Sequence, residues 1–151
     1  MFGAEVESIK VLREIADDLT SLDPDRLFDD QIEHSVVELR CQLTRLESVW
    51  YRHVGELETR HTYLHAGYTS LAAWVAHRCG LAWGHAKHVI GIARSLADMP
   101  QTQQAFAAGD VSLVAVRLLV KARARNTELF VRDDAGQVGG RRPQADQAEP
   151  G

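Results

Sequence analysis

The side chains that could do chemistry in this chain are mainly histidines, of which there are seven in 151 residues. Two pairs have helical spacing, His61 with His65 and His85 with His88. Imidazoles three or four residues apart on a helix can share a zinc ion. Neither pair has a carboxylate or a cysteine spaced to complete the ligand set of such a site. We therefore expect no metal and no cofactor.

Motifs for catalysis do not occur in the sequence either. It contains no glycine-rich phosphate loop, no Gly-x-Ser-x-Gly motif and no His-Glu-x-x-His motif. The acidic residues of positions 1–65 are spaced like the solvent-facing sides of helices, not like a paired general acid and base. We expect that the chain is not an enzyme.

The net charge of −4 conceals an uneven distribution of charge along the chain. Residues 1–65 have a net charge of −7, residues 66–125 of +5 and residues 126–151 of −2. A basic segment can mark a surface for a polyanion such as DNA, because Lys and Arg displace the counterions condensed on phosphates. The acidic part of the same chain could equally neutralise it, and charge alone leaves both alternatives open.

The composition is that of an ordinary globular protein, with 45% hydrophobic and 25% charged residues. The two cysteines, Cys41 and Cys79, cannot form a disulfide framework. The first ten residues lack the apolar run of a signal peptide. No stretch approaches the roughly 20 apolar residues that span a bilayer. These features predict a cytoplasmic protein that does not contact a membrane.

Apolar residues recur at helical spacing throughout, and the alternating pattern of strands is nearly absent. We predict an all-α fold, a helical bundle with one long helix in its N-terminal half and a helix-turn-helix-like C-terminal half. The predicted domain covers residues 1–125, with an acidic part (1–65) and a basic part (66–125), and residues 126–151 are expected to be a disordered tail. The predicted helices, separated by a loop over 61–68, span residues 5–20, about 29–61, 71–78, 83–97, 101–108 and 113–124.

The predicted long helix carries an apolar seam. Its hydrophobic residues follow one another at intervals of three and four and continue after a change of phase; they are Ile32, Val36, Leu39, Leu43, Leu46, Trp50, Val54 and Leu57. Such a seam must pack against another helix. Either it packs within the chain, on the first helix and the C-terminal half, or it forms a homodimer through residues 32–57.

Residues 71–93 match the pattern of a helix-turn-helix. A small residue, Ala76, stands where the two helices would cross, and Gly80 stands in the tight turn, which requires a positive φ. The positions expected in the shared core hold Val75, Cys79, Leu81, Ala86 and Val89.

In this interpretation the second helix enters the major groove by its N-terminal turns. It presents Trp83, His85, Lys87 and His88 outward, and Lys87 and His88 could contact bases or phosphates. Trp83 could instead be packed in the core, which is the commoner environment of tryptophan. The candidate residues for binding double-stranded DNA are Arg78, Trp83, Lys87, His88, Arg94, Lys121 and Arg123.

Three runs carry a resemblance to a known family: GYTSLAAWVAHRCGL from Gly67, HVIGIARSLADMP from His88 and AFAAGDVSLVAVRLLV from Ala105. Together they resemble the 13E12 repeat family, whose shared region is domain of unknown function 222, over about residues 5–125. The resemblance implies a helical region that usually precedes an HNH nuclease domain, which binds a divalent metal and cuts DNA. No histidine follows Phe130, so neither the nuclease signature nor its metal is carried over.

One departure from the family concerns the start of the second helix of the helix-turn-helix-like segment. The family commonly has Ser and Glu at the positions of Ala82 and His85, where they form a capping box, and the loss of an N-cap side chain costs about 1 kcal/mol. The segment from Thr69 onward is also loosely similar to the helix-turn-helix region of ParB-type partition proteins. We expect a non-catalytic module that binds DNA, or alternatively a protein-interaction module that self-associates through the long helix.

Overall fold

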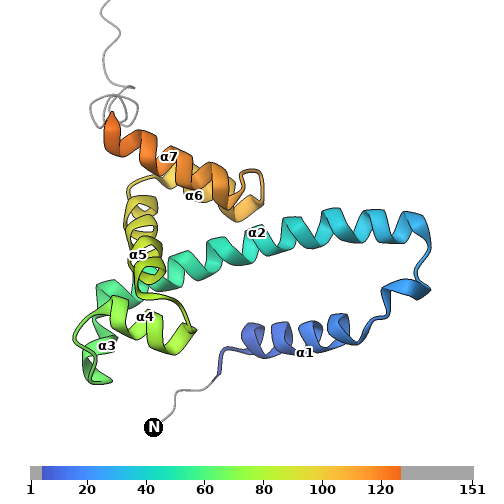
Figure 1. The fold of residues 1–151 in the computed structure, drawn as a ribbon, viewed down its shortest axis with the longest axis horizontal. Coiled ribbons are helices and arrows are strands. Elements are labelled where there is room, and N and C mark those ends of the chain that lie inside the picture. The colour runs from blue at the N-terminus through green and yellow to red at the C-terminus, as the bar shows by residue number, and fades with distance from the viewer. Residues whose placement is uncertain (1–4, 127–151) are drawn as a thin grey trace, which may run out of the picture. The chain divides into compact units, whose positions relative to one another are not determined.

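The computed structural model describes residues 5–126, and every regular element in that range is a helix, with no strand among them (Figure 1). The predicted all-α class is therefore confirmed. The predicted tail lies, except for its first residue, outside the described residues. The elements are α1 (Glu7–Ser21), a short 3-10 helix η1 (Pro24–Arg26), α2 (Asp29–Arg60), α3 (Thr62–His65), α4 (Leu71–Cys79), α5 (Trp83–Ala97), α6 (Pro100–Ala108) and α7 (Leu113–Arg125).

The segment predicted as a loop, residues 61–68, is partly helical. His61 adopts a left-handed conformation, with a φ of 53°, and this ends α2. The chain then makes one more helical turn, α3. A four-residue helix is too short to show an apolar period in the sequence, which is why the prediction missed it.

Side-chain and glycine caps set the boundaries of the C-terminal helices. The Oγ of Ser70 accepts a hydrogen bond from the amide of Ala73 at 3.1 Å, and the Oγ of Ser112 accepts one from Ala115 at 3.2 Å. Both contacts satisfy amides that the first turn of a helix leaves unpaired. Helices α4 and α6 end at Gly80 and Gly109, which have left-handed φ values of 67° and 82°. A residue without a Cβ adopts this conformation at little cost.

The contacts within the chain divide it into two units at Cys41, in the middle of α2. The first unit contains α1, η1 and the beginning of α2; the second contains the rest of α2 and the helices from α3 to α7. Residues 1–41 have a net charge of −7, whereas residues 42–126 have ten basic and five acidic residues, a net charge of +5. The acidic character of the chain is thus concentrated in the first unit.

The buried core belongs to the second unit. Val75, Val89, Phe106 and Val116 are fully buried there, and Tyr51 of α2 packs on Phe106 with ring centroids 6.1 Å apart. The C-terminal end of the α2 seam takes part in this core, since Val54 is buried and its neighbours Trp50 and Leu57 pack against the same cluster. In the first unit, by contrast, none of the described residues is buried.

Candidate nucleic-acid interface

Helices α4 and α5 pack on each other and are joined by the short turn after Cys79. Gly80 forms the C-cap of α4 in the left-handed conformation, and the amide of Leu81 donates to the carbonyl of Ala76 at 2.9 Å. The turn glycine predicted from the sequence therefore has the positive φ that the prediction required.

Most of the predicted shared core of α4 and α5 is buried, with one exception. Val75, Ala86 and Val89 have no exposed surface, and Leu81 packs against the cluster that they form. Cys79, predicted in the same core, is exposed. Cys79 is the last residue of α4, where the apolar face of the helix is exposed to solvent.

Trp83, the first residue of α5, was a candidate for DNA contact, with packing in the core as the favoured alternative, and that alternative is wrong. Its side chain is 51% exposed, whereas Ala86 and Val89 of the same helix are buried. The ammonium group of Lys87, one turn further along, lies 5.9 Å from the centroid of the Trp83 ring. The two side chains form a cation–π pair on the outer face of the helix.

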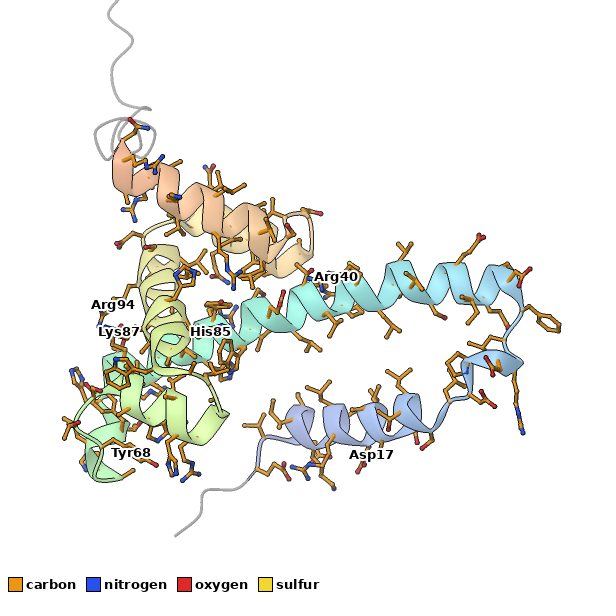
Figure 2. All side chains as sticks on the ribbon, viewed as in Figure 1. Asp17, Arg40, Tyr68, His85, Lys87 and Arg94 are labelled. Atoms are coloured by element: carbon orange, nitrogen blue, oxygen red, sulfur yellow. The ribbon has the colours of Figure 1, made fainter. Side chains whose placement is uncertain are left out.

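The outer face of α5 also contains two glycines. At about 100° per residue, Gly84 and Gly91 lie between the direction of Lys87 and that of His88, both of which are exposed. A Cβ added at either glycine would meet nothing within 4 Å, so no contact among residues 5–126 requires glycine there. Figure 2 shows the side chains of Lys87 and Arg94 along this helix.

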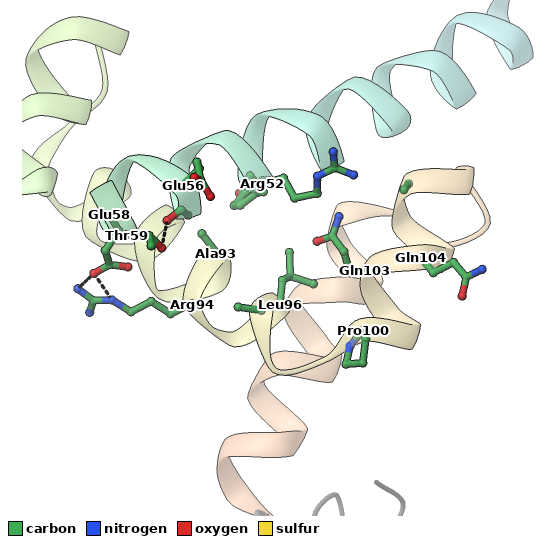
Figure 3. A pocket seen from close by; sticks show the side chains of 14 residues that line it. Arg52, Glu56, Glu58, Thr59, Ala93, Arg94, Leu96, Pro100, Gln103 and Gln104 are labelled. Carbon is green, nitrogen blue, oxygen red and sulfur yellow. Dashed lines mark hydrogen bonds and ion pairs between the residues drawn. The ribbon is translucent and has the colours of Figure 1, made fainter. Parts of the chain in front are cut away.

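Arg94 is held by an ion pair with Glu58 of α2, as Figure 3 shows. Its Nε donates to Oε1 of Glu58 at 2.6 Å, and its Nη2 donates to the same oxygen. The hydrogen bond to Glu58 raises the pKa of Arg94 above its ordinary value. Arg94 remains exposed, but its guanidinium also fixes α5 to α2. The partners are 36 positions apart in the sequence, so the pair could not be predicted from helical spacing.

A second basic group lies between α5 and α7. His88 and Lys121 line one groove there, together with the apolar side chains of Ile92, Val114 and Leu118. Val114 and Leu118 are 64% and 63% exposed. Spacings of four, three and four along α7 place Val114, Leu118, Lys121 and Arg125 on one helical stripe. That spacing was the signal in the sequence that could have identified the groove.

The last two predicted residues, Arg78 and Arg123, have different environments. Arg78 is exposed at the end of α4, with its guanidinium 5.9 Å from the centroid of the Trp74 ring. Arg123 is only 25% exposed; its Nη1 lies 3.6 Å from Oδ2 of Asp98 and donates to the carbonyl of Ser95 at 3.5 Å. Arg123 therefore joins α7 to the C-terminal end of α5. Arg117, which was not predicted, also lines the groove.

The cleft drawn in Figure 3 lies between α2, α5 and α6. Both carboxylates at its rim are in ion pairs, Glu56 with Arg60 at 2.6 Å and Glu58 with Arg94. Within residues 5–126, no three His, Cys, Asp or Glu side chains gather as metal ligands would. None of the helices in this range has the length and apolar character needed to cross a bilayer.

Comparison with known proteins gives one match. A family model described as "Domain of unknown function (DUF222)" matches residues 33–137, which run from the first turns of α2 past the end of α7. No curated protein and no solved structure matches the chain. Because the family model covers well over half of the 151 residues, and includes the whole α4–turn–α5 unit, this chain belongs to the DUF222 family.

Proposed function

We propose that this chain is a non-catalytic module that binds double-stranded DNA through the outer face of α5. The observation that carries the proposal is the composition of that face: Trp83 and Lys87 on one side, His88 on the other, and Gly84 and Gly91 between them. All five are exposed. In helix-turn-helix proteins the second helix contacts the major groove of DNA. In this chain that helix would be α5.

The two glycines support a close approach by a partner backbone. A glycine in the interior of a helix costs about 0.5–1 kcal/mol relative to alanine. Packing within the part of the chain that the structure describes does not offset that cost, since the space beside both residues is open there. A phosphate backbone lying along α5 would use that space, and Lys87 would reach its phosphates.

The start of α5 offers further donors. Ala82 occupies the N-cap position, with a φ of −61° and a ψ of 145°, and provides no side-chain hydrogen bond to the first turn. The amides of that turn can therefore donate to a phosphate, and the helix dipole favours an anion at the same end. The departure from the family capping box thus agrees with an anion at this position.

The charge of the second unit favours the same surface. Its net charge of +5 includes Arg78 at the end of α4 and Lys121 in the groove beside His88. Arg94 and Arg123 contribute charge while their ion pairs hold α5 in place. By its family resemblance, such a region would bring an HNH nuclease to DNA, and we propose targeting of this kind as its role.

A second candidate function, protein interaction through self-association, is favoured by a different observation. The first unit exposes an apolar surface on both of its helices. The two functions use separate residues and do not exclude each other.

The DNA proposal is tested by fluorescence anisotropy with a pool of short mixed-sequence duplexes, from low to physiological salt. The Lys87→Ala variant should bind more weakly. It should also lower the slope of log K against log salt by about 0.9, the value for one lost phosphate contact. The matched control is Lys10→Ala, which removes the same charge from the acidic α1.

Two outcomes contradict the proposal. The wild-type chain could fail to bind any duplex even at low salt, in which case α4 and α5 are only a packing unit. Alternatively, Lys87→Ala and Lys10→Ala could weaken binding equally, which would mean that only the overall charge matters and that α5 makes no specific contact.

A further inference from the structure

Residues 5–41 form a helical unit with no buried side chain. Ten of its large hydrophobic residues are between 41% and 75% exposed: Val6, Ile9, Val11, Ile15, Leu19, Leu22, Phe28, Val36, Val37 and Leu39. Short helices in water gain most of their stability from the packing of an apolar face. The exposed surface of this unit therefore requires a cover.

The two helices of this unit line a common apolar groove. Leu19, Leu22 and Leu27 contribute from α1 and the η1 segment, and Ile32, Val36 and Leu39 contribute from α2. The polar members of the lining, His34, Ser35 and Glu38, all come from α2. The groove therefore suits an aliphatic helix face better than a polar or charged ligand.

The charged residues of α1 lie away from this groove. At about 100° per residue, the apolar side chains from Ile9 to Leu22 occupy one half of the helix, and the acidic residues Glu14, Asp17 and Asp18 occupy the other. On α2 the separation is less strict: Val36 lines the groove and Val37, its neighbour, does not, but Glu38 is also part of the lining. The groove is thus mainly aliphatic, and the acidic residues of α1 lie outside it.

The area of the aliphatic face is that of half a protein interface. A large apolar side chain offers on the order of 100 Å² of surface. Without Val37, which lies outside the groove, the nine remaining half-exposed side chains offer roughly 450 Å² per copy before any rim residue is counted. A standard interface buries about 800 Å² per partner, rim included. This agreement indicates a partner of similar size and apolar character.

We propose that this partner is a second copy of the same hairpin, so that two chains form a four-helix bundle around a two-fold axis. A face made almost entirely of aliphatic side chains is complementary to itself, and two-fold dimers pair identical patches. Two antiparallel helices with an apolar stripe on each are half of such a bundle. The proposal restricts the predicted dimer contact on α2 to its beginning, because Val54 and Leu57 serve the core of the chain, and it adds α1. It does not rest on DNA binding.

The test is the molar mass of the full-length chain by sedimentation equilibrium over a range of concentrations. The wild-type chain should be a dimer that dissociates on dilution. Val36→Lys should shift it to monomer, because an ammonium group in the aliphatic interface would lose its hydration. Val37→Lys is the matched control: it makes the same substitution at the next residue, which is equally exposed (71% against 65%) and outside the groove, and it should remain a dimer.

A second pair of variants makes the same test on α1, so that a local change in α2 cannot account for the result. Leu19→Lys, in the groove, should dissociate the dimer, whereas Ser21→Lys, on the acidic side of α1, should not. The dependence of the molar mass on salt concentration tests whether the partner is a second acidic unit. Two units of net charge −7 repel each other, so self-association should strengthen with added salt. A wild-type chain that stays monomeric, a dimer that survives Val36→Lys, or a dimer that salt dissociates would each overturn the proposal.

Discussion

Gly84 and Gly91 are residues of α5 that packing among the described residues does not explain. Each lies in a helix, each has open space where a Cβ would be, and each is flanked on the helix surface by Lys87 and His88. Glycine lowers helix stability, so its presence at two such positions points to a contact outside the chain. Adding a single methyl group at such a position should raise the stability of the chain and lower its affinity for DNA.

We expect Gly91→Ala to stabilise the chain against urea unfolding by about 0.5–1 kcal/mol and to weaken DNA binding. The added methyl group favours the helix but narrows the space that a phosphate backbone would use. Gly55→Ala is the control, because Gly55 is also in a helix with open space beside it, and it lies in α2. It should raise stability and leave affinity unchanged. Equal affinities for both variants would show that Gly91 is not at the DNA contact.

Tyr51 gives a prediction for the dependence of stability on pH. Its side chain is 2% exposed, and burial raises the pKa of its hydroxyl, against the opposing effect of the hydrogen bond and charge of Arg117. A raised pKa in the folded state means that folding favours the protonated form. The resulting stability is fully present below the unfolded pKa of about 10 and is lost as the pH rises through the folded value.

The measurement is the free energy of unfolding of wild type and Tyr51→Phe, from neutral to alkaline pH. At neutral pH the hydroxyl is protonated in both the folded and the unfolded state, so the difference in stability between the two proteins should not vary with pH there. Above pH 10 the wild type should lose stability relative to Tyr51→Phe, because its unfolded state ionises first. A difference that stays constant across this range would mean that Tyr51 does not ionise with a perturbed pKa.

At the scale of elements, the N-terminus of α5 differs from those of α4 and α7. Ser70 and Ser112 cap α4 and α7 with side-chain oxygens, while Ala82 gives α5 no such bond. The open amides of α5 cost stability, and in the proposed function they serve a phosphate.

The Ala82→Ser variant should therefore stabilise the chain by about 0.5–2 kcal/mol and weaken DNA binding, because the serine hydroxyl would occupy an amide that otherwise contacts phosphate. Chemical denaturation and fluorescence anisotropy measure the two effects. The reverse change at another helix, Ser112→Ala, should cost a similar amount of stability without a specific loss of affinity. Increased stability with unchanged affinity would remove the helix N-terminus from the proposed contact.

At the scale of the whole molecule, charge and apolar surface are divided between the two units. The first unit is acidic, with a net charge of −7, and exposes aliphatic surface; the second is basic, with a net charge of +5, and contains the core. Opposite dependences on salt follow, since DNA binding should weaken with salt and self-association should strengthen. A single salt series, read by anisotropy and by molar mass, therefore distinguishes the two surfaces.

The amino-acid sequence determined the features that depend on neighbours along the chain. Helix positions follow from apolar periodicity, and helix ends follow from Ser70, Gly80 and Ser112, because each cap is made within a few residues of itself. The family also followed from sequence, through the runs after Gly67. Periodicity identifies the apolar face of a helix, but it does not say whether anything covers that face.

The tertiary structure decided which faces are covered and which charges are paired. One seam on α2 is exposed at Val36, in the first unit, and buried at Val54, which packs in the core of the second unit. Trp83 is 51% exposed, whereas Ala86 and Val89 of the same helix are buried. Arg94 is bound to Glu58 across 36 residues of sequence, a contact that only folding creates. Burial and ion pairs depend on contacts between residues that are distant in the chain. They are therefore set by three-dimensional packing.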